Sequence, residues 1–182
     1  LAITEKYDGT SWTEVNDLNT GRSQLGGAGT QTSALAFGGE GPPTTGATES
    51  YNGTSFSEVA DLNTARYALR GAGVDNTSVL AFGGGPGNKS ETETWNGTSW
   101  AETADLNTAR SSFRGGAGTP SSALAFGGYT TTYVAVNESW NGSAWTEVAD
   151  LNTTAGYGAQ TIGSSNTNAL ACGGYTGTAD TA

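Results

Sequence analysis

The sequence of 182 residues contains no histidine and only one cysteine. Without an imidazole the chain has no Ser–His or Cys–His nucleophile and no ordinary zinc or copper site. A single cysteine cannot form an internal disulfide, so the fold has to be stable without one. These absences exclude most enzyme classes, and we expect a protein with no catalytic residues, no bound metal and no cofactor.

Positive charge is scarce as well. Seven Lys and Arg residues stand against 17 Asp and Glu residues, which gives a formal net charge of −10. This balance argues against a nucleic acid or an anionic membrane surface as the main partner. No apolar run approaches the roughly 20 residues that span a bilayer, so we expect no membrane insertion.

The ends and the length of the chain set its organisation. Methionine is absent and residue 1 is Leu, so we expect the chain to be processed or to be an excerpt of a longer product. The length suits one domain with a sizeable core, and we assign residues 1–182 to a single domain.

Glycine and threonine are abundant, with 29 residues of each, and both follow an internal repeat. Gly disfavours helices, whereas Thr suits a pleated strand. Four copies of one unit run through the chain at spacings of 44, 44 and 45 residues, and they start at Tyr7, Tyr51, Trp95 and Trp140.

Each unit divides into four short segments with the alternation of a β-strand. In the first full set these segments span residues 25–30, 34–37, 48–52 and 55–59. Asn52-Gly53, repeated as Asp8-Gly9, Asn96-Gly97 and Asn141-Gly142, predicts a hairpin turn between the third and fourth strands. Four antiparallel strands in a repeat of about 45 residues are typical of a β-propeller blade.

Residue size predicts how the units pack. Leu35 and Phe37 point to one face of the second strand, and the alanines point to the other, so a large face can nest on the small face of the next unit. The glycine-rich first strand suits a crowded central axis. Cys172 stands where the other copies have Phe, and we expect it to be a small buried hydrophobic residue.

Two features resemble the Kelch repeat. One is the double glycine after a short apolar strand, and the other is a pair of aromatic residues five positions apart in the third and fourth strands, as in Trp95 and Trp100. The degenerate, Thr- and Asn-rich form looks like Kelch-like repeats in predicted proteins of marine bacteriophages and environmental bacteria. The resemblance implies a β-propeller. The galactose-oxidase relatives of these propellers use histidine ligands for copper, and this chain has no histidine.

Most Kelch propellers have six or seven blades, whereas this chain has four copies of the unit. We expect an all-β fold of four four-stranded antiparallel blades, one of them composite. Its outer strands would come from residues 1–15 and its inner strands from residues 157–172, which would leave no open sheet edge. The alternatives are a homodimer in which two chains share one larger ring, and an excerpt from a longer array.

Twelve of the 17 acidic residues recur in every unit, so we interpret them as structural. Three arginines recur in three units, where each either pairs with a repeated acid or rings the axis and meets a ligand: Arg22, Arg66 and Arg110. Two further arginines are less easily explained by symmetry and are better candidates for polar contacts in the channel: Arg70 and Arg114.

The most variable segments connect the second and third strands. Three tyrosines there offer flat amphipathic surfaces for sugar rings: Tyr129, Tyr133 and Tyr175. The leading hypothesis is a non-catalytic binding or structural propeller on a virion, for example in a tail fibre, or on a cell exterior, which engages a surface glycan or a partner protein. The alternatives are an assembly module without a ligand and a histidine-free glycosidase.

Overall fold

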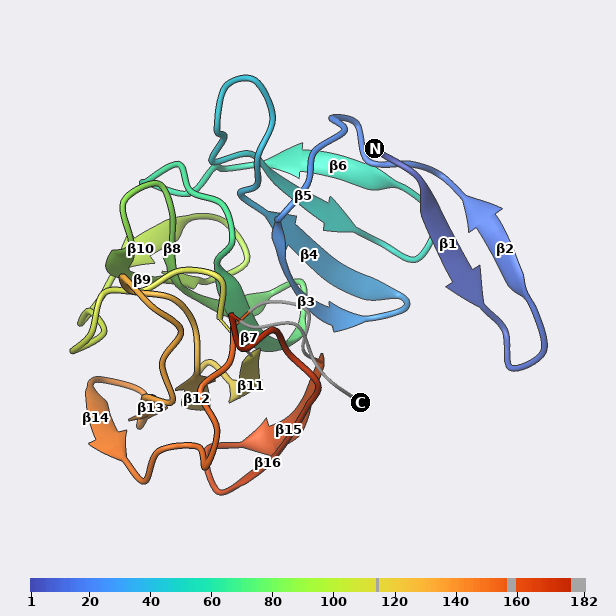
Figure 1. Ribbon diagram of the computed structural model, residues 1–182. Helices are drawn as coiled ribbons and strands as arrows, with labels where there is room; N and C mark the ends of the chain where they lie inside the picture. The colour runs from blue at the N-terminus through green and yellow to red at the C-terminus, as the bar shows by residue number, and fades with distance from the viewer. Residues whose placement is uncertain (114, 157–159, 178–182) are drawn as a thin grey trace.

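The structure is a computed structural model that describes residues 1–113, 115–156 and 160–177 (Figure 1). The described residues form sixteen β-strands, all paired antiparallel, and contain no helix. The prediction of an all-β protein is confirmed. Accordingly, no helix in the described part of the chain could span a membrane.

Twelve strands form three four-stranded sheets in which the strands pair in the order of the sequence. The first sheet contains β3 (Gly26–Thr30), β4 (Ser33–Phe37), β5 (Thr48–Tyr51) and β6 (Phe56–Val59). The second contains β7 (Arg70–Asp75), β8 (Ser78–Gly84), β9 (Lys89–Trp95) and β10 (Trp100–Glu102). The third contains β11 (Gly115–Thr119), β12 (Ser122–Phe126), β13 (Asn137–Trp140) and β14 (Trp145–Val148).

The remaining four strands form two separate hairpins. The N-terminal hairpin pairs β1 (Thr4–Tyr7) with β2 (Trp12–Val15). The C-terminal hairpin pairs β15 (Gln160–Ser165) with β16 (Asn168–Cys172). By position in the repeat, the first is the outer half of a sheet and the second is the inner half of one.

The predicted Asx-Gly turns are confirmed in all four places. At Asp8, Asn52, Asn96 and Asn141 the side-chain Oδ1 accepts the backbone N–H groups two and three residues further on, at 2.8 to 3.0 Å. The glycine that follows has a φ of 92° to 102°, which side chains rarely adopt. The sequence therefore fixes each turn locally.

The first strands of the sheets lie side by side around a common centre (Figure 1): β3 contacts β7, β7 contacts β11, and β11 contacts β15. Among the described residues, the glycines and alanines of these strands line a cavity of about 190 Å³. A Cβ added at Gly71 would lie 2.5 Å from the Phe37 ring, and one added at Gly116 would lie 2.6 Å from the Phe82 ring. Glycine at these two positions therefore lets Phe37 and Phe82 reach the next sheet.

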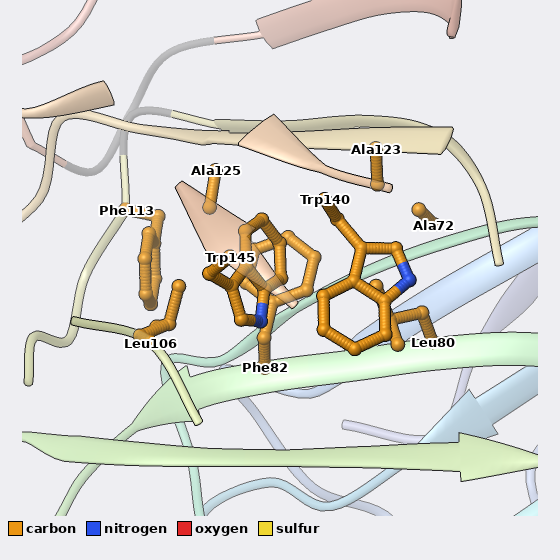
Figure 2. Close-up of a cluster of buried hydrophobic side chains, with 9 residues drawn as sticks. All are labelled: Ala72, Leu80, Phe82, Leu106, Phe113, Ala123, Ala125, Trp140 and Trp145. Atoms are coloured by element: carbon orange, nitrogen blue, oxygen red, sulfur yellow. The ribbon is translucent and has the colours of Figure 1, made fainter. Parts of the chain in front are cut away.

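The core fills the space between successive sheets. Figure 2 shows Trp140 and Trp145 between the strand that carries Leu80 and the strand that carries Ala123. Phe82 from β8 meets the Trp145 ring edge-on, with the centroids 5.1 Å apart. The bulky face of one sheet thus nests on the alanine face of the next, and the aromatic residues of the outer strands close the gap.

The predicted composite sheet does not form within this chain. The two hairpins are separate two-stranded sheets, and they lie on different sides of the molecule (Figure 1). Each hairpin is held by the sheet next to it in the sequence: Gln31 Nε2 donates to Tyr7 O, and Asn166 Nδ2 donates to Trp140 O at 3.2 Å. The two hairpins therefore stay apart within one chain.

Cys172 is a related correction. We expected it to be buried, but it is exposed on β16. The reason is that, among the described residues, β16 is the edge of a two-stranded sheet, whereas β4, β8 and β12 lie between two strands.

Candidate functional site

The three repeated arginines are buried and paired. Each extends from the segment before a sheet to a glutamate on the third strand of that sheet, and the side chains of both partners are at most 1% exposed. Arg66 lies 3.1 Å from Glu93, and Arg110 lies 2.9 Å from Glu138. Burial lowers the pKa of both arginines, and the neighbouring carboxylates act to raise it. These contacts favour the structural interpretation, since the buried guanidinium groups present no surface to a ligand.

The repeated acidic and amide residues complete the same network. Asn107 donates from its backbone N and from Nδ2 to Glu138 Oε2, at 2.7 and 2.9 Å, and Asn63 does the same for Glu93. Asp61 Oδ1 accepts the backbone N–H of Thr48 at 3.2 Å. The buried carboxylates are therefore occupied by structural donors, as we expected from their repetition.

Opposing carboxylates occur in the outer strands, where Glu138 lies directly across from Glu147. A glycosidase would need one such residue to exchange a proton with a substrate. Glu138 is buried beneath its arginine and asparagine partners, so it lacks the access this role requires. In the described part of the chain, no three acidic or cysteine side chains gather as metal ligands would.

Arg70 differs from the other arginines. It lines a depression of about 490 Å³ together with Gln24, Ala68 and Ser112. Its NH1 donates to Leu69 O at 3.0 Å, and among the described residues it forms no ion pair. Burial lowers the pKa of the Arg70 guanidinium, but an arginine keeps its charge at neutral pH. The depression therefore carries a partly desolvated cation that can attract an anionic group.

The wall of this depression is fixed by the backbone. Gln24, Ala68 and Ser112 all adopt left-handed conformations, with φ of 53°, 52° and 48°. The N–H of Ala68 donates to Gln24 O at 2.8 Å, and the N–H of Ser112 donates to Ala68 O at 3.0 Å. This chain of hydrogen bonds holds the three positions in line, so the depression is preformed.

The three predicted tyrosines come together beside it. The Tyr129 and Tyr133 rings are 5.3 Å apart, and the Tyr133 and Tyr175 rings are 5.4 Å apart. Tyr129 and Tyr175 are 38% and 40% exposed. Tyr129 forms two backbone hydrogen bonds with Ser111, next to the Ser112 position of the depression. We call Tyr129, Tyr133 and Tyr175 the tyrosine cluster.

The variable loops share a face of the molecule with the segments that enter each sheet. Backbone bridges join Ser23 to Glu40, Tyr67 to Gly85 and Ser111 to Tyr129.

The candidate Arg114 lies outside the described residues. Sequence reasoning missed Gln24 and Ser112, although both stand two residues after a repeated arginine, which was the available signal.

Comparison with known proteins adds no assignment. No protein-family model matches this chain, and no curated protein sequence matches it closely enough to count as a relative.

Proposed function

We propose that this chain forms a β-propeller whose role is to bind a ligand, not to catalyse a reaction. Three sheets of identical strand order support the propeller, because their first strands lie side by side around one glycine-lined cavity. The 44-residue repeat and the Kelch-like pattern agree with it.

The proposed ligand is an acidic glycan on a cell surface. The observation that carries this proposal is Arg70, a half-buried cation with no carboxylate partner among the described residues, in a preformed depression. Its guanidinium can form a charge-assisted pair with a sugar carboxylate or sulfate. The tyrosine cluster on the same face offers aromatic rings for the apolar faces of the neighbouring sugars. This role suits a protein displayed on a virion or a cell exterior.

A glycan array that includes neutral, carboxylated and sulfated oligosaccharides tests the proposal. We expect binding to acidic members, and calorimetry with the best of them then compares the wild type with Arg70→Gln. Since a hydrogen bond to a charged group contributes about 1.5–3 kcal/mol, the variant should bind roughly 10- to 160-fold more weakly.

Lys89→Gln is the matched control, because Lys89 is a surface cation already paired with Glu91 at 3.2 Å. It removes the same charge and should leave the affinity unchanged. No binding to any acidic glycan, or equal losses in Arg70→Gln and Lys89→Gln, would refute the proposal.

A second candidate is an assembly module that engages other protein chains. The observation in its favour is the N-terminal hairpin, whose Trp12 is 67% exposed although its counterparts Trp100 and Trp145 are 6% exposed. Solution mass measurements, described below, test this candidate without reference to a glycan.

A further inference from the structure

A cavity of about 130 Å³ separates the third sheet from the C-terminal hairpin. On one side it is lined by the third sheet and the segment after it, through Leu124, Phe126, Asn137 and Leu151. On the other side it is lined by two alanines of β16, Ala169 and Ala171. The lining that the structure describes is therefore mostly apolar, with one amide side chain.

The corresponding place between the other sheets holds a tryptophan. Between the second and third sheets, Trp145 belongs to a cluster with Leu80, Phe82, Leu106, Ala123 and Ala125. Between the first and second sheets, Trp100 belongs to a cluster with Leu35, Phe37, Leu62, Val79 and Ala81. In the repeat these two sets correspond position by position to the lining of the cavity.

At both of these places the tryptophan also has a polar partner of the same type. Trp100 Nε1 donates to Thr48 Oγ1 at 3.1 Å, and Trp145 Nε1 donates to Thr92 Oγ1 at 3.0 Å. Asn137 occupies the same repeat position in the third sheet. Its Oδ1 is buried and has no hydrogen-bond partner among the described residues. The cavity thus presents an unused acceptor where an indole N–H lies elsewhere.

The missing tryptophan is Trp12 by position in the repeat. It lies on β2 and is 67% exposed. Its ring is 5.3 Å from the Tyr7 ring, close to the separations of 5.4 Å for Trp95 and Trp100 and of 5.3 Å for the equivalent pair in the third sheet. The N-terminal hairpin therefore carries a preformed aromatic pair without a site to fill.

We propose that the N-terminal hairpin of one copy of this chain docks on β16 of a second copy. Trp12 then fills the cavity of the second copy, and its indole N–H donates to Asn137 Oδ1. Strand β1 adds to the edge of β16 and completes a four-stranded sheet.

The register follows from the intact sheets. Phe37 lies opposite Thr48, and Phe82 lies opposite Thr92. The same register places Thr4 of one copy opposite Cys172 of the other. The same register brings Glu5 of one copy next to Asn152 of the other, and both side chains are exposed in the single chain. At the equivalent positions of the intact sheets, Asn63 donates two hydrogen bonds to Glu93.

A second copy fits better than closure within one chain. Each hairpin is already fixed to its neighbouring sheet by the kind of hydrogen bond that joins whole sheets. Asn76 donates to Tyr51 O between the first two sheets, and Gln31 donates to Tyr7 O and Asn166 to Trp140 O at the two hairpins. Joining the two hairpins of one chain would change the packing between all three sheets. Two copies that exchange hairpins keep that packing, and each satisfies the open edge of the other.

The single cysteine makes the register testable in the full chain. Directly opposite residues of an antiparallel pair have Cα atoms about 4.5–5.5 Å apart, within the range of a disulfide. On oxidation, Thr4→Cys should form a disulfide with Cys172 of another copy, which gives dimers or larger species on a non-reducing gel that reductant abolishes. Thr13→Cys is the matched control, because Thr13 lies on β2, which β1 would separate from β16, so its thiol is out of reach of Cys172 and should not cross-link.

Each other result overturns the proposal. A Thr4→Cys protein that stays monomeric and loses its thiols has closed within one chain. A protein that stays monomeric and keeps its thiols has not paired the two strands.

Mass in solution gives a second, independent measurement. Light scattering on the wild-type protein should give at least twice the 18.3 kDa of one chain. Trp12→Ala should return the mass to that of one chain, while Val74→Ala, which shortens another exposed apolar residue, should not. A monomeric wild type, or an assembly unaffected by Trp12→Ala, would contradict the docking of Trp12.

Discussion

Replacing Glu138 with Gln tests whether each buried ion pair holds a sheet to the segment that precedes it in the chain. Glu138 Oε1 lies 2.9 Å from Arg110 NH1, and Oε2 accepts two hydrogen bonds from Asn107. Gln is close to Glu in shape and keeps one carbonyl acceptor, so the substitution removes mainly the negative charge. Arg110, which is 0% exposed, is then left as an uncompensated cation in the interior.

The expected loss is large because burial prevents water from replacing the lost partner. Breaking a buried pair by removing one member costs about 3–5 kcal/mol. For a chain of 150–250 residues, each kcal/mol shifts the melting temperature by about 2–4 °C. The Glu138→Gln variant should therefore melt roughly 6–20 °C below the wild type.

Urea unfolding followed by both tryptophan fluorescence and far-UV circular dichroism measures the change in the free energy of unfolding. Glu147→Gln is the matched control, since Glu147 is exposed and lies directly opposite Glu138 on the next strand. It should be neutral or slightly stabilising, because like charges directly opposite each other repel. If the two variants differ by less than about 0.5 kcal/mol, the ion pair does not have the role assigned to it.

Two further predictions follow from the close packing and from the turns. Gly71→Ala would force a Cβ to within 2.5 Å of the Phe37 ring and should lower the free energy of unfolding, measured in urea, by about 1–3 kcal/mol. Gly27 occupies the same repeat position, but no atom lies closer than 3.6 Å to its added Cβ, so Gly27→Ala should cost less than about 1 kcal/mol. Two backbone N–H groups lower the pKa of the Asp8 carboxyl below 3.8, so its contribution to stability is present above the unfolded pKa and is lost as the pH falls through the folded pKa. Asp8→Asn, which copies the residue at the other three turns, should flatten this acid limb when urea midpoints are compared between pH 7 and about pH 2, and an unchanged acid limb would contradict the assignment.

The sequence by itself determined the strands, the turns and the pairing order within each sheet. Alternating side chains, as in Leu35 and Phe37, act over a few residues, and an Asx-Gly turn such as Asn52-Gly53 carries its own hydrogen bonds. Both are local, so four copies of one pattern gave four inner and four outer hairpins, three pairs of which join into four-stranded sheets. Repetition also identified the recurring acidic residues as structural, because a residue present in every unit meets the same surroundings in each unit.

Repetition set Arg70 apart from the three repeated arginines, but only the tertiary structure showed which arginines have a carboxylate partner. Arg66 and Arg70 are four residues apart, yet one is buried against Glu93 and the other lines a depression without a carboxylate partner among the described residues. Long-range packing decides which charges find partners, and the distance between Arg66 and Glu93 in the folded chain cannot be read from the sequence. The same holds for the tyrosine cluster, whose members meet because two loops far apart in the chain converge.

The expected closure within the chain failed for a related reason. The half-sheets at the two ends are complementary in sequence, and complementarity is what sequence reasoning detects. Whether they meet within one chain depends on the angle that each pair of sheets adopts, which accumulates over three interfaces. That angle is set by how side chains such as Phe37 and Phe82 fill the space above the glycines of the next sheet. The result leaves Trp12 exposed on the N-terminal hairpin, away from the cavity beside β16.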